Sequence, residues 1–179
     1  MINIARQDRY STLSITLHWL TLVLMVAIYA SIELHESLPR GHALRGPMED
    51  WHIYLGVCLL PIALFRAVTI LRAKIPAIVP QPPTWQMRIT KLMKLYLYVL
   101  MIGAPLIGWI MVNAEGHVVR LWGLALPSLV SESESLAGLA SEAHEVLGIS
   151  GYFFIAIHAF AALYHHYLVK DNTLKRMLP

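Results

Sequence analysis

The chain has 179 residues, of which 57% are hydrophobic and 14% charged, and its mean hydropathy is +0.57. This composition excludes an ordinary soluble domain and is typical of a membrane protein. The net charge of +3 comes from basic residues that border apolar segments, so we expect no nucleic-acid partner. Cys58 is the single cysteine, which excludes an internal disulfide framework.

Four apolar stretches follow one another along the chain, at residues 10–32, 51–70, 95–114 and 146–169. Each is close to the ~20 residues that a helix needs to cross the hydrocarbon core of a bilayer. A signal peptide is the alternative for the first stretch, but its apolar run exceeds the usual length of roughly 7–15 residues. The sequence therefore predicts an all-α fold, a transmembrane four-helix bundle that forms a single domain over residues 1–179.

The basic residues are distributed unequally between the two sides of these four spans. Arg40, Arg45 and Arg120 fall on one side, and the other eleven of the fourteen lysines and arginines fall on the opposite side. The positive-inside rule then places both termini in the cytoplasm. The acids lean the other way, since only Asp8 and Asp171 fall on the cytoplasmic side.

Two connections have a composition that ends helices. Pro76, Pro80, Pro82 and Pro83 lie between the second and third spans and predict an extended cytoplasmic strap. The connection between the third and fourth spans is rich in glycine, serine and glutamate and predicts an outer loop.

Nine histidines are unusual in such a chain, because ionisable groups in hydrocarbon are costly and often mark function. His144 and His158 lie 14 residues apart on the fourth span, which is about 21 Å and close to four helical turns. They therefore share one face, with the small residues Gly148 and Gly151 between them. Such a surface lets a flat macrocycle approach the helix backbone.

A haem iron with two axial histidines needs one ligand from each of two helices at the same depth. His52, at the outer start of the second span, matches the depth of His144. His18, about 13 Å inside Arg9 along the first span, matches the depth of His158. The sequence thus predicts two b-type haems, with iron ligated by the pairs His18/His158 and His52/His144.

Other roles for these four histidines were weighed. Hydrogen bonding between helices is a structural role that membrane bundles use. Zinc would have only two ligands at each depth, and a haem-free transport or scaffold protein could use histidines for metal binding or proton relay. Because Cys58 is alone, thioether attachment of haem is excluded. The matched depths on three helices favour haem.

Arg66 lies 14 residues beyond His52, the same interval that separates His144 from His158. It therefore returns to the face of His52 near the depth of the inner pair. There it can contact a haem propionate as a bidentate partner. The alternative is that its side chain reaches the cytoplasmic interface.

Several motifs resemble the bacterial cytochrome b561 family of small four-helix dihaem membrane cytochromes, and within it the members that act as superoxide oxidase. The resemblance covers nearly the whole chain. The most specific part is the tail at residues 165–177, which membrane physics alone does not require. The other motifs are Leu17-His18-Trp19, Trp51-His52 with Gly56, Ala143-His144-Glu145 with Gly148, and Ile157-His158-Ala159.

This resemblance implies a protein of the bacterial inner membrane whose four histidines ligate two haems b. It also implies one-electron transfer from periplasmic superoxide to ubiquinone, with His165 in the position of a quinone-contacting histidine. For His165 the alternative is an interfacial residue beside lipid headgroups. For the whole chain the alternative is an electron-transfer subunit that links the quinone pool to a separate periplasmic redox partner. The sequence assigns no catalytic residue.

One feature departs from the superoxide expectation. Superoxide is an anion, and a positively charged entrance would raise its rate of encounter. The outer side instead carries most of the acids, so steering requires a basic cluster over the outer haem. Its members would be Arg40, Arg45, Arg120 and the outer-loop histidines His35, His42 and His117.

Overall fold

The structure is a computed structural model and describes residues 9–179; Arg6 and Asp8, which entered the charge count, lie outside this range. Four long helices account for most of it, and each is long and apolar enough to cross a membrane. The prediction of four membrane-length apolar helices is therefore confirmed. The helices are α1 (Thr12–Ser37), α2 (Arg45–Arg72), α3 (Thr84–Ala114) and α4 (Glu134–Tyr164).

Each helix extends past its predicted apolar stretch at one end or both, although α1 begins at Thr12 rather than at residue 10 and α4 ends at Tyr164 rather than at residue 169. α3 and α4 have 31 residues each, about 46 Å at 1.5 Å per residue. This exceeds a hydrocarbon thickness of ~30 Å, so the helices tilt or extend past it. Serine hydroxyls cap the N-termini of two helices. Ser11 accepts a hydrogen bond from the amide of Ser14 at 3.2 Å at the start of α1, and Ser133 accepts one from the amide of Leu136 at 3.4 Å at the start of α4.

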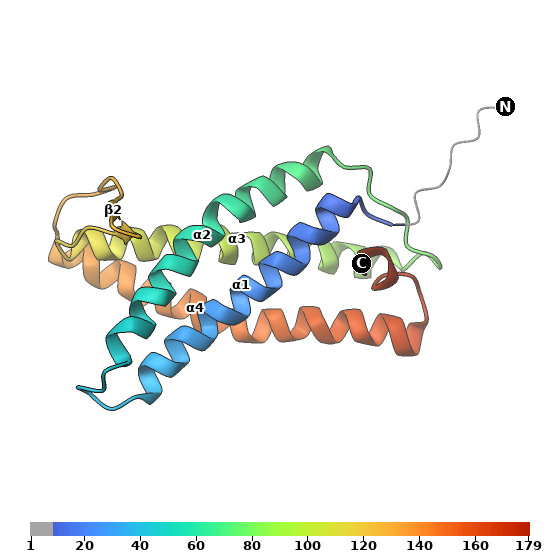
Figure 1. The fold of residues 1–179 in the computed structure, drawn as a ribbon. Helices are drawn as coiled ribbons and strands as arrows, with labels where there is room; N and C mark the ends of the chain where they lie inside the picture. The colour runs from blue at the N-terminus through green and yellow to red at the C-terminus, as the bar shows by residue number, and fades with distance from the viewer. Residues whose placement is uncertain (1–8) are drawn as a thin grey trace.

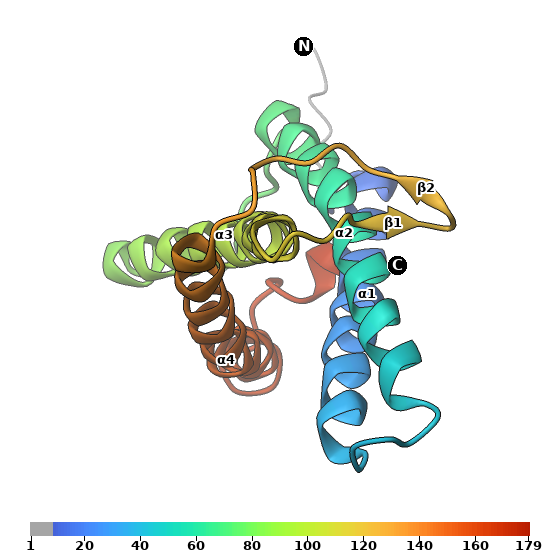
Figure 2. The same cartoon turned by 90° about the vertical axis from the view of Figure 1, so that its left-hand side faces the viewer.

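The helices form two pairs that cross each other (Figures 1 and 2). α1 packs along α2, α3 packs along α4, and α2 joins the pairs by packing against α3. The start of α1 and the C-terminus lie at the same end of the bundle, which we call the tail end (Figure 1). The opposite end carries the loop between α3 and α4 and is called the hairpin end.

A short β-hairpin was not predicted. β1 (Arg120–Leu121) pairs antiparallel with β2 (Leu124–Ala125). Trp122 and Gly123 join them with φ values of 48° and 87°, as a two-residue hairpin turn requires. The fold is therefore mostly helical, with this small sheet as an addition to the all-α expectation.

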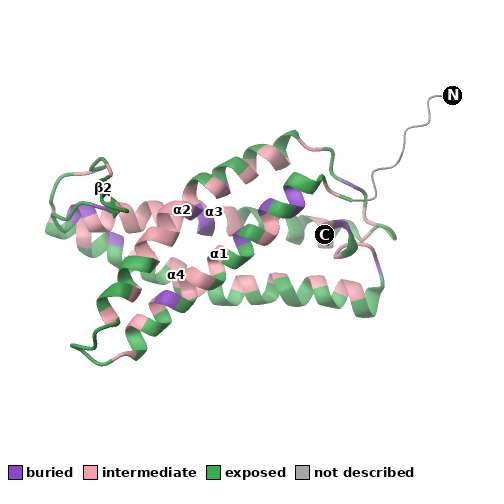
Figure 3. Ribbon diagram, in the orientation of Figure 1, coloured by how far each residue is buried: buried purple, intermediate pink, exposed green. Residues whose placement is uncertain are grey.

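Little of the chain is buried against itself. A small core forms where Leu59 and Ala63 of α2 meet Met101 of α3. Most helix residues are partly or fully exposed (Figure 3), and large apolar side chains such as Leu71 (84%) and Phe160 (70%) are among them. Such surfaces are suited to lipid rather than to water.

The C-terminal segment folds back over the tail end. It contains a π-helix, η1 (His165–Val169), and a 3₁₀-helix, η2 (Lys175–Met177). Asn172 hydrogen-bonds the non-helical strap at 73–83, accepting from the Val79 amide at 2.8 Å. The indole of Trp19 donates to the carbonyl of Met177 at 2.8 Å. The tail therefore connects α1, the strap and α4.

Candidate functional site

The structure brings together the histidines that sequence depth had paired. The ring centres of His18 and His158 lie 6.4 Å apart, and those of His52 and His144 lie 6.0 Å apart. A metal–imidazole bond of about 2.0 Å places two rings that share one ion at roughly 6.3 Å between centres. Both spacings therefore fit a pair of axial ligands, and the two pairs lie at different depths.

The hairpin-end pair has its proton positions set by the backbone. His52 Nδ1 lies 3.1 Å from the carbonyl oxygen of Ile28, and His144 Nδ1 lies 2.9 Å from that of Ala104. A carbonyl only accepts, so each Nδ1 donates and each Nε2 keeps its lone pair. Metal-binding histidines are commonly oriented in this way. Gly108 makes room for His144, because a Cβ there would lie 3.0 Å from His144 Cε1.

A cavity of about 680 Å³ opens beside this pair, within the range of roughly 300–1,000 Å³ typical of cofactor sites. Gly56 and Gly148 lie on its walls among mainly apolar side chains. Nothing in the structure lies within 4 Å of a Cβ built on Gly148. Trp109 also lines the cavity, and its buried indole nitrogen has no partner among the described residues. The donor set and the space fit a b-type haem.

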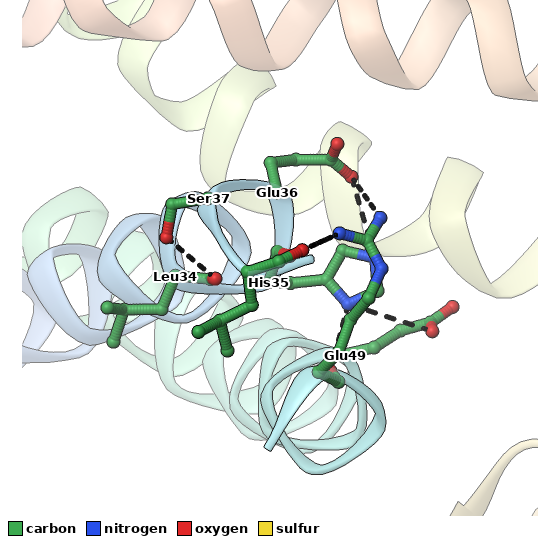
Figure 4. A network of polar contacts seen from close by, with 7 residues as sticks. Leu34, His35, Glu36, Ser37 and Glu49 are labelled. Carbon is green, nitrogen blue, oxygen red and sulfur yellow. Dashed lines mark hydrogen bonds and ion pairs between the residues drawn. The ribbon is translucent and has the colours of Figure 1, made fainter. Parts of the chain in front are cut away.

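The entrance to this cavity is acidic. Besides His52 and His144, five carboxylates and one further histidine line the cavity, and none of the described lysines or arginines does. Arg45 instead binds the α1–α2 loop, donating to the carbonyls of His35 at 2.7 Å and Leu38 at 2.8 Å, in the network drawn in Figure 4. None of Arg40, Arg45 and Arg120 lines the cavity, and Arg45 Nη2 lies 3.7 Å from the lining residue Glu36. The lining residues are Glu33, Glu36, Glu49, Glu115, Glu145 and His35.

His35 was expected from the sequence to be a solvated outer-loop residue, but its side chain is only 12% exposed. Its Nδ1 lies 2.9 Å from the carbonyl oxygen of Arg45, and its ring lies near Glu36 and Glu49 at 3.5 and 3.9 Å. Its position at the end of α1 had indicated a loop residue. Only the three-dimensional fold of the α1–α2 connection brings these groups together.

The tail-end pair is arranged differently. The Nη2 atom of Arg66 lies 2.8 Å from His18 Nδ1. A guanidinium only donates, so His18 Nδ1 accepts, and the proton of the neutral ring lies on Nε2. The ring of Trp19 stands edge-on to His18 at 5.5 Å. His18 thus has the opposite proton arrangement from His52 and His144.

Arg66 has few other partners at this depth. Its Nη1 approaches the sulfur of Met101 at 3.8 Å, and its guanidinium carbon lies 5.7 Å from the centre of the Tyr98 ring. Within residues 9–179 it forms no ion pair, and its buried Nε has no hydrogen-bond partner; nor has the buried hydroxyl of Tyr98. These two unpaired groups mark a place for an anionic acceptor such as a haem carboxylate.

His165 lies at the start of the π-helix and contacts Asp171. Lys170 adopts a left-handed conformation with φ of 59°, and the amide of Asp171 donates to the carbonyl of His165 at 3.1 Å. This turn brings Asp171 Oδ2 to 2.5 Å from His165 Nδ1. Burial alone would raise the pKa of Asp171, but hydrogen bonds from Thr173 and His165 outweigh it and lower that pKa.

Two tyrosines between the histidine pairs were also missed. The Tyr29 hydroxyl donates to the carbonyl of Gly148 at 2.8 Å, and its ring lies 4.5 Å from that of Tyr152. The Tyr152 hydroxyl donates to Glu33. These contacts join α1 to α4. Their sequence pattern matches any aromatic lipid-facing position, so nothing in the sequence distinguished them.

Four membrane-length helices with facing histidines define a multi-pass membrane protein of the electron-transfer class. The chain belongs to the prokaryotic cytochrome b561 family, whose model matches residues 9–179. Proteins of this family bind b-type haem.

Three relatives cover nearly the same length. Cytochrome b561 homolog 1 of Escherichia coli (strain K12) is 36% identical over 172 residues, which are 96% of this chain and 98% of the relative. The probable superoxide oxidase CybB of Yersinia pestis is 35% identical over 171 residues, which are 96% of each chain. Cytochrome b561 homolog 2 of Escherichia coli (strain K12) is 24% identical over 172 residues, with coverage of 96% and 92%.

Proposed function

We propose that this chain is a dihaem superoxide oxidase of the bacterial inner membrane, which transfers electrons from periplasmic superoxide to ubiquinone, with both termini in the cytoplasm. The observation that carries the dihaem assignment is the spacing of the two histidine pairs, 6.0 and 6.4 Å between ring centres. The named activity of the Yersinia pestis relative, at 35% identity, supports the choice of donor. Bound haem would supply one-electron chemistry.

The chain's own residues would hold and orient the reacting groups. His52 and His144 would hold the hairpin-end iron through Nε2, because their Nδ1 atoms donate to backbone carbonyls. His18 and His158 would ligate the tail-end iron, and Arg66 with Tyr98 would bind its carboxylate. The hairpin-end cavity is open to the aqueous donor, while the tail-end pair lies toward the side from which a quinone would approach.

Protons for quinone reduction would pass through the tail. Two superoxide anions each give up one electron and become dioxygen, and ubiquinone takes up two electrons and two protons to become ubiquinol. His165 Nδ1 donates to Asp171, so a protonated His165 can deliver a proton from Nε2.

The direct test uses the purified chain in lipid nanodiscs. A pyridine haemochrome assay should give two haems b per chain, and a superoxide flux with ubiquinone present should yield ubiquinol until superoxide dismutase is added. His158→Ala should leave one haem and abolish ubiquinol formation. Two haems whose reduction is indifferent to superoxide dismutase would disprove the superoxide assignment and leave the cytochrome intact.

A second function is favoured by the five glutamates at the cavity entrance. They repel superoxide and attract a basic protein surface. The chain would then be an electron-transfer subunit between the quinone pool and a separate periplasmic redox protein. A basic cytochrome c serves as the probe: electron exchange with it, weakened by salt and by Glu36→Gln or Glu49→Gln, would support this function over superoxide oxidation.

A further inference from the structure

A second cavity lies on the α1–α2 pair, apart from both histidine pairs. Its volume is about 480 Å³, and its walls come from the start of α1, the last turns of α2 and the first residues of the strap. No described residue of α3, α4 or the C-terminal segment lines it, and neither His18 nor Arg66 does. Figure 1 shows the first turn of α1 beside the last turns of α2. This cavity is therefore separate from the proposed haem sites.

The α2 wall of this cavity changes in character along the helix axis. Its lining residues follow helical spacing and so share one face; they are Phe65, Val68, Thr69 and Arg72. Phe65 and Arg72 lie about 10 Å apart along the axis. Arg72 is the last residue of α2, and Phe65 lies deeper in the span. A phospholipid has the same order of chemistry, with acyl chains in the hydrocarbon and a charged headgroup at the interface.

The apolar part of the cavity is open to lipid. Leu13, Phe65 and Val68 are 48%, 53% and 43% exposed, so the core of the protein does not cover them. Contact with hydrocarbon stabilises apolar surface of this kind. An acyl chain would cover it, whereas a small soluble anion would leave it uncovered. The lining therefore favours a lipid over free phosphate.

The polar part of the cavity carries positive charge without a counter-ion from the chain. Arg72 and Lys74 are exposed, and among the described residues neither forms an ion pair. No described acid lines the cavity. The Thr69 hydroxyl donates to the carbonyl of Phe65 at 2.8 Å, so it can only accept a further hydrogen bond. These groups suit a phosphate and a headgroup hydroxyl, and they repel a headgroup that ends in an ammonium.

We propose that this cavity binds one anionic phospholipid of the phosphatidylglycerol class, from the leaflet that meets the tail end. Its phosphate contacts Arg72 and Lys74, and a glycerol hydroxyl donates to Thr69. One acyl chain follows α2 along Val68 and Phe65. Basic pockets beside membrane helices are known to recognise anionic headgroups. In the proposed orientation this leaflet is the cytoplasmic one, but the site depends on neither the haems nor the electron donor.

The test is native mass spectrometry of the full chain, purified in detergent and stripped of lipid. Phosphatidylglycerol, phosphatidylethanolamine and phosphatidylcholine with identical acyl chains are titrated separately. One phosphatidylglycerol per chain should bind more tightly than either of the other two lipids. Arg72→Gln and Lys74→Gln should each weaken that binding about fivefold, and the double variant roughly twentyfold or more. Phosphatidylcholine binding should be unchanged.

A matched control separates a site from overall charge. Arg88 and Lys91 are exposed cations in the first turns of α3, at the same end of the bundle, and neither lines the cavity. The Arg88→Gln/Lys91→Gln variant loses the same charge and should keep the affinity for phosphatidylglycerol. Phe65→Ala should weaken all three lipids and preserve their order. Circular dichroism checks that each variant is folded, and the single substitutions suffice if the double variant is not.

Three results would overturn the proposal. The first is equal affinity for phosphatidylglycerol and either of the other lipids. The second is an equal loss in the double variant at Arg72 and Lys74 and in the control variant, because binding would then follow net charge alone. The third is displacement of the lipid by inorganic phosphate, which would indicate a site for a free anion. Selective binding that only the cavity substitutions weaken, and that phosphate does not compete with, supports the lipid site.

Discussion

Gly151 and Gly148 lie three residues apart on α4 but face different surroundings. A Cβ at Gly151 would collide with the hydroxyl of Tyr29 and lie 3.0 Å from Leu100 Cδ2, whereas nothing lies within 4 Å of a Cβ at Gly148. The same substitution to alanine should therefore have opposite effects at the two positions. Gly151→Ala should destabilise the haem-free chain, and Gly148→Ala should not.

The magnitude follows from three contributions. Forcing a methyl group into a filled space costs about 1–3 kcal/mol. Displacing Tyr29 also breaks its hydrogen bond to the Gly148 carbonyl, which costs about 1 kcal/mol. Alanine returns up to about 1 kcal/mol through its higher helix propensity. The net expectation for Gly151→Ala is a loss of roughly 1–3 kcal/mol, or several degrees in Tm.

The assay is thermal unfolding of the haem-free variants in detergent, followed by circular dichroism. Tyr29→Phe removes the colliding hydroxyl, so adding it to Gly151→Ala should recover much of the collision term. Gly148→Ala should melt at or above the unmodified chain yet bind the hairpin-end haem more weakly, because its methyl group enters the cavity. A Gly151→Ala chain as stable as Gly148→Ala would refute the packing on which this reasoning depends.

Three further predictions concern electron transfer and the tail. Raising the ionic strength should speed reduction by superoxide roughly twofold or more and slow reduction by a basic protein, since salt screens the acidic entrance; stopped-flow rates at two salt concentrations decide this. His165→Ala and Asp171→Asn should keep both haems but lower ubiquinol formation, with Asp171→Asn the milder, and an unchanged quinone KM and kcat would exclude the proton route. The folded pKa of Asp171 is lowered, so its contacts stabilise the chain fully above the ordinary value of 3.8, and this stability is lost as pH falls from that value through the folded pKa. Melting curves should show a constant Tm gap between the unmodified chain and Asp171→Asn above pH 3.8 and a narrowing gap as the pH falls below it.

Much of the framework could be predicted because membrane helices obey simple length rules. Apolar runs located α1 to α4, and the distances of the histidines from the charged ends of these runs indicated which of them lie at one depth. Helix ends were placed too conservatively. Segments such as the start of α3 at Thr84 carry charges and yet continue the helix beyond the hydrocarbon. Periodicity reports which residues can share a face, but not how far a helix extends into the interface.

Other features depend on tertiary contacts and on turns that bring side chains together, and hydrophobic periodicity does not predict these. The contact between His165 and Asp171 requires the π-turn and the left-handed Lys170. Arg45 was available for steering by sequence, but the α1–α2 loop engages it with backbone carbonyls. The depth of Arg66 followed from its interval to His52, whereas its donation to His18 depends on where the side chain turns. Spacing along the chain therefore predicted the depth of each histidine pair in the membrane. It did not predict which nitrogen of each imidazole ring carries the proton.

Trp19 and Trp109 give each histidine pair an optical reporter of its own. The ring of Trp19 lies 5.5 Å from His18, and Trp109 lines the cavity at the hairpin end. Indole emission is quenched by energy transfer to a nearby porphyrin, and the transfer falls steeply with distance. In a chain whose Trp51, Trp85 and Trp122 are replaced by phenylalanine, removing Trp19 or Trp109 in turn would let fluorescence follow the filling of the two ends separately and in real time.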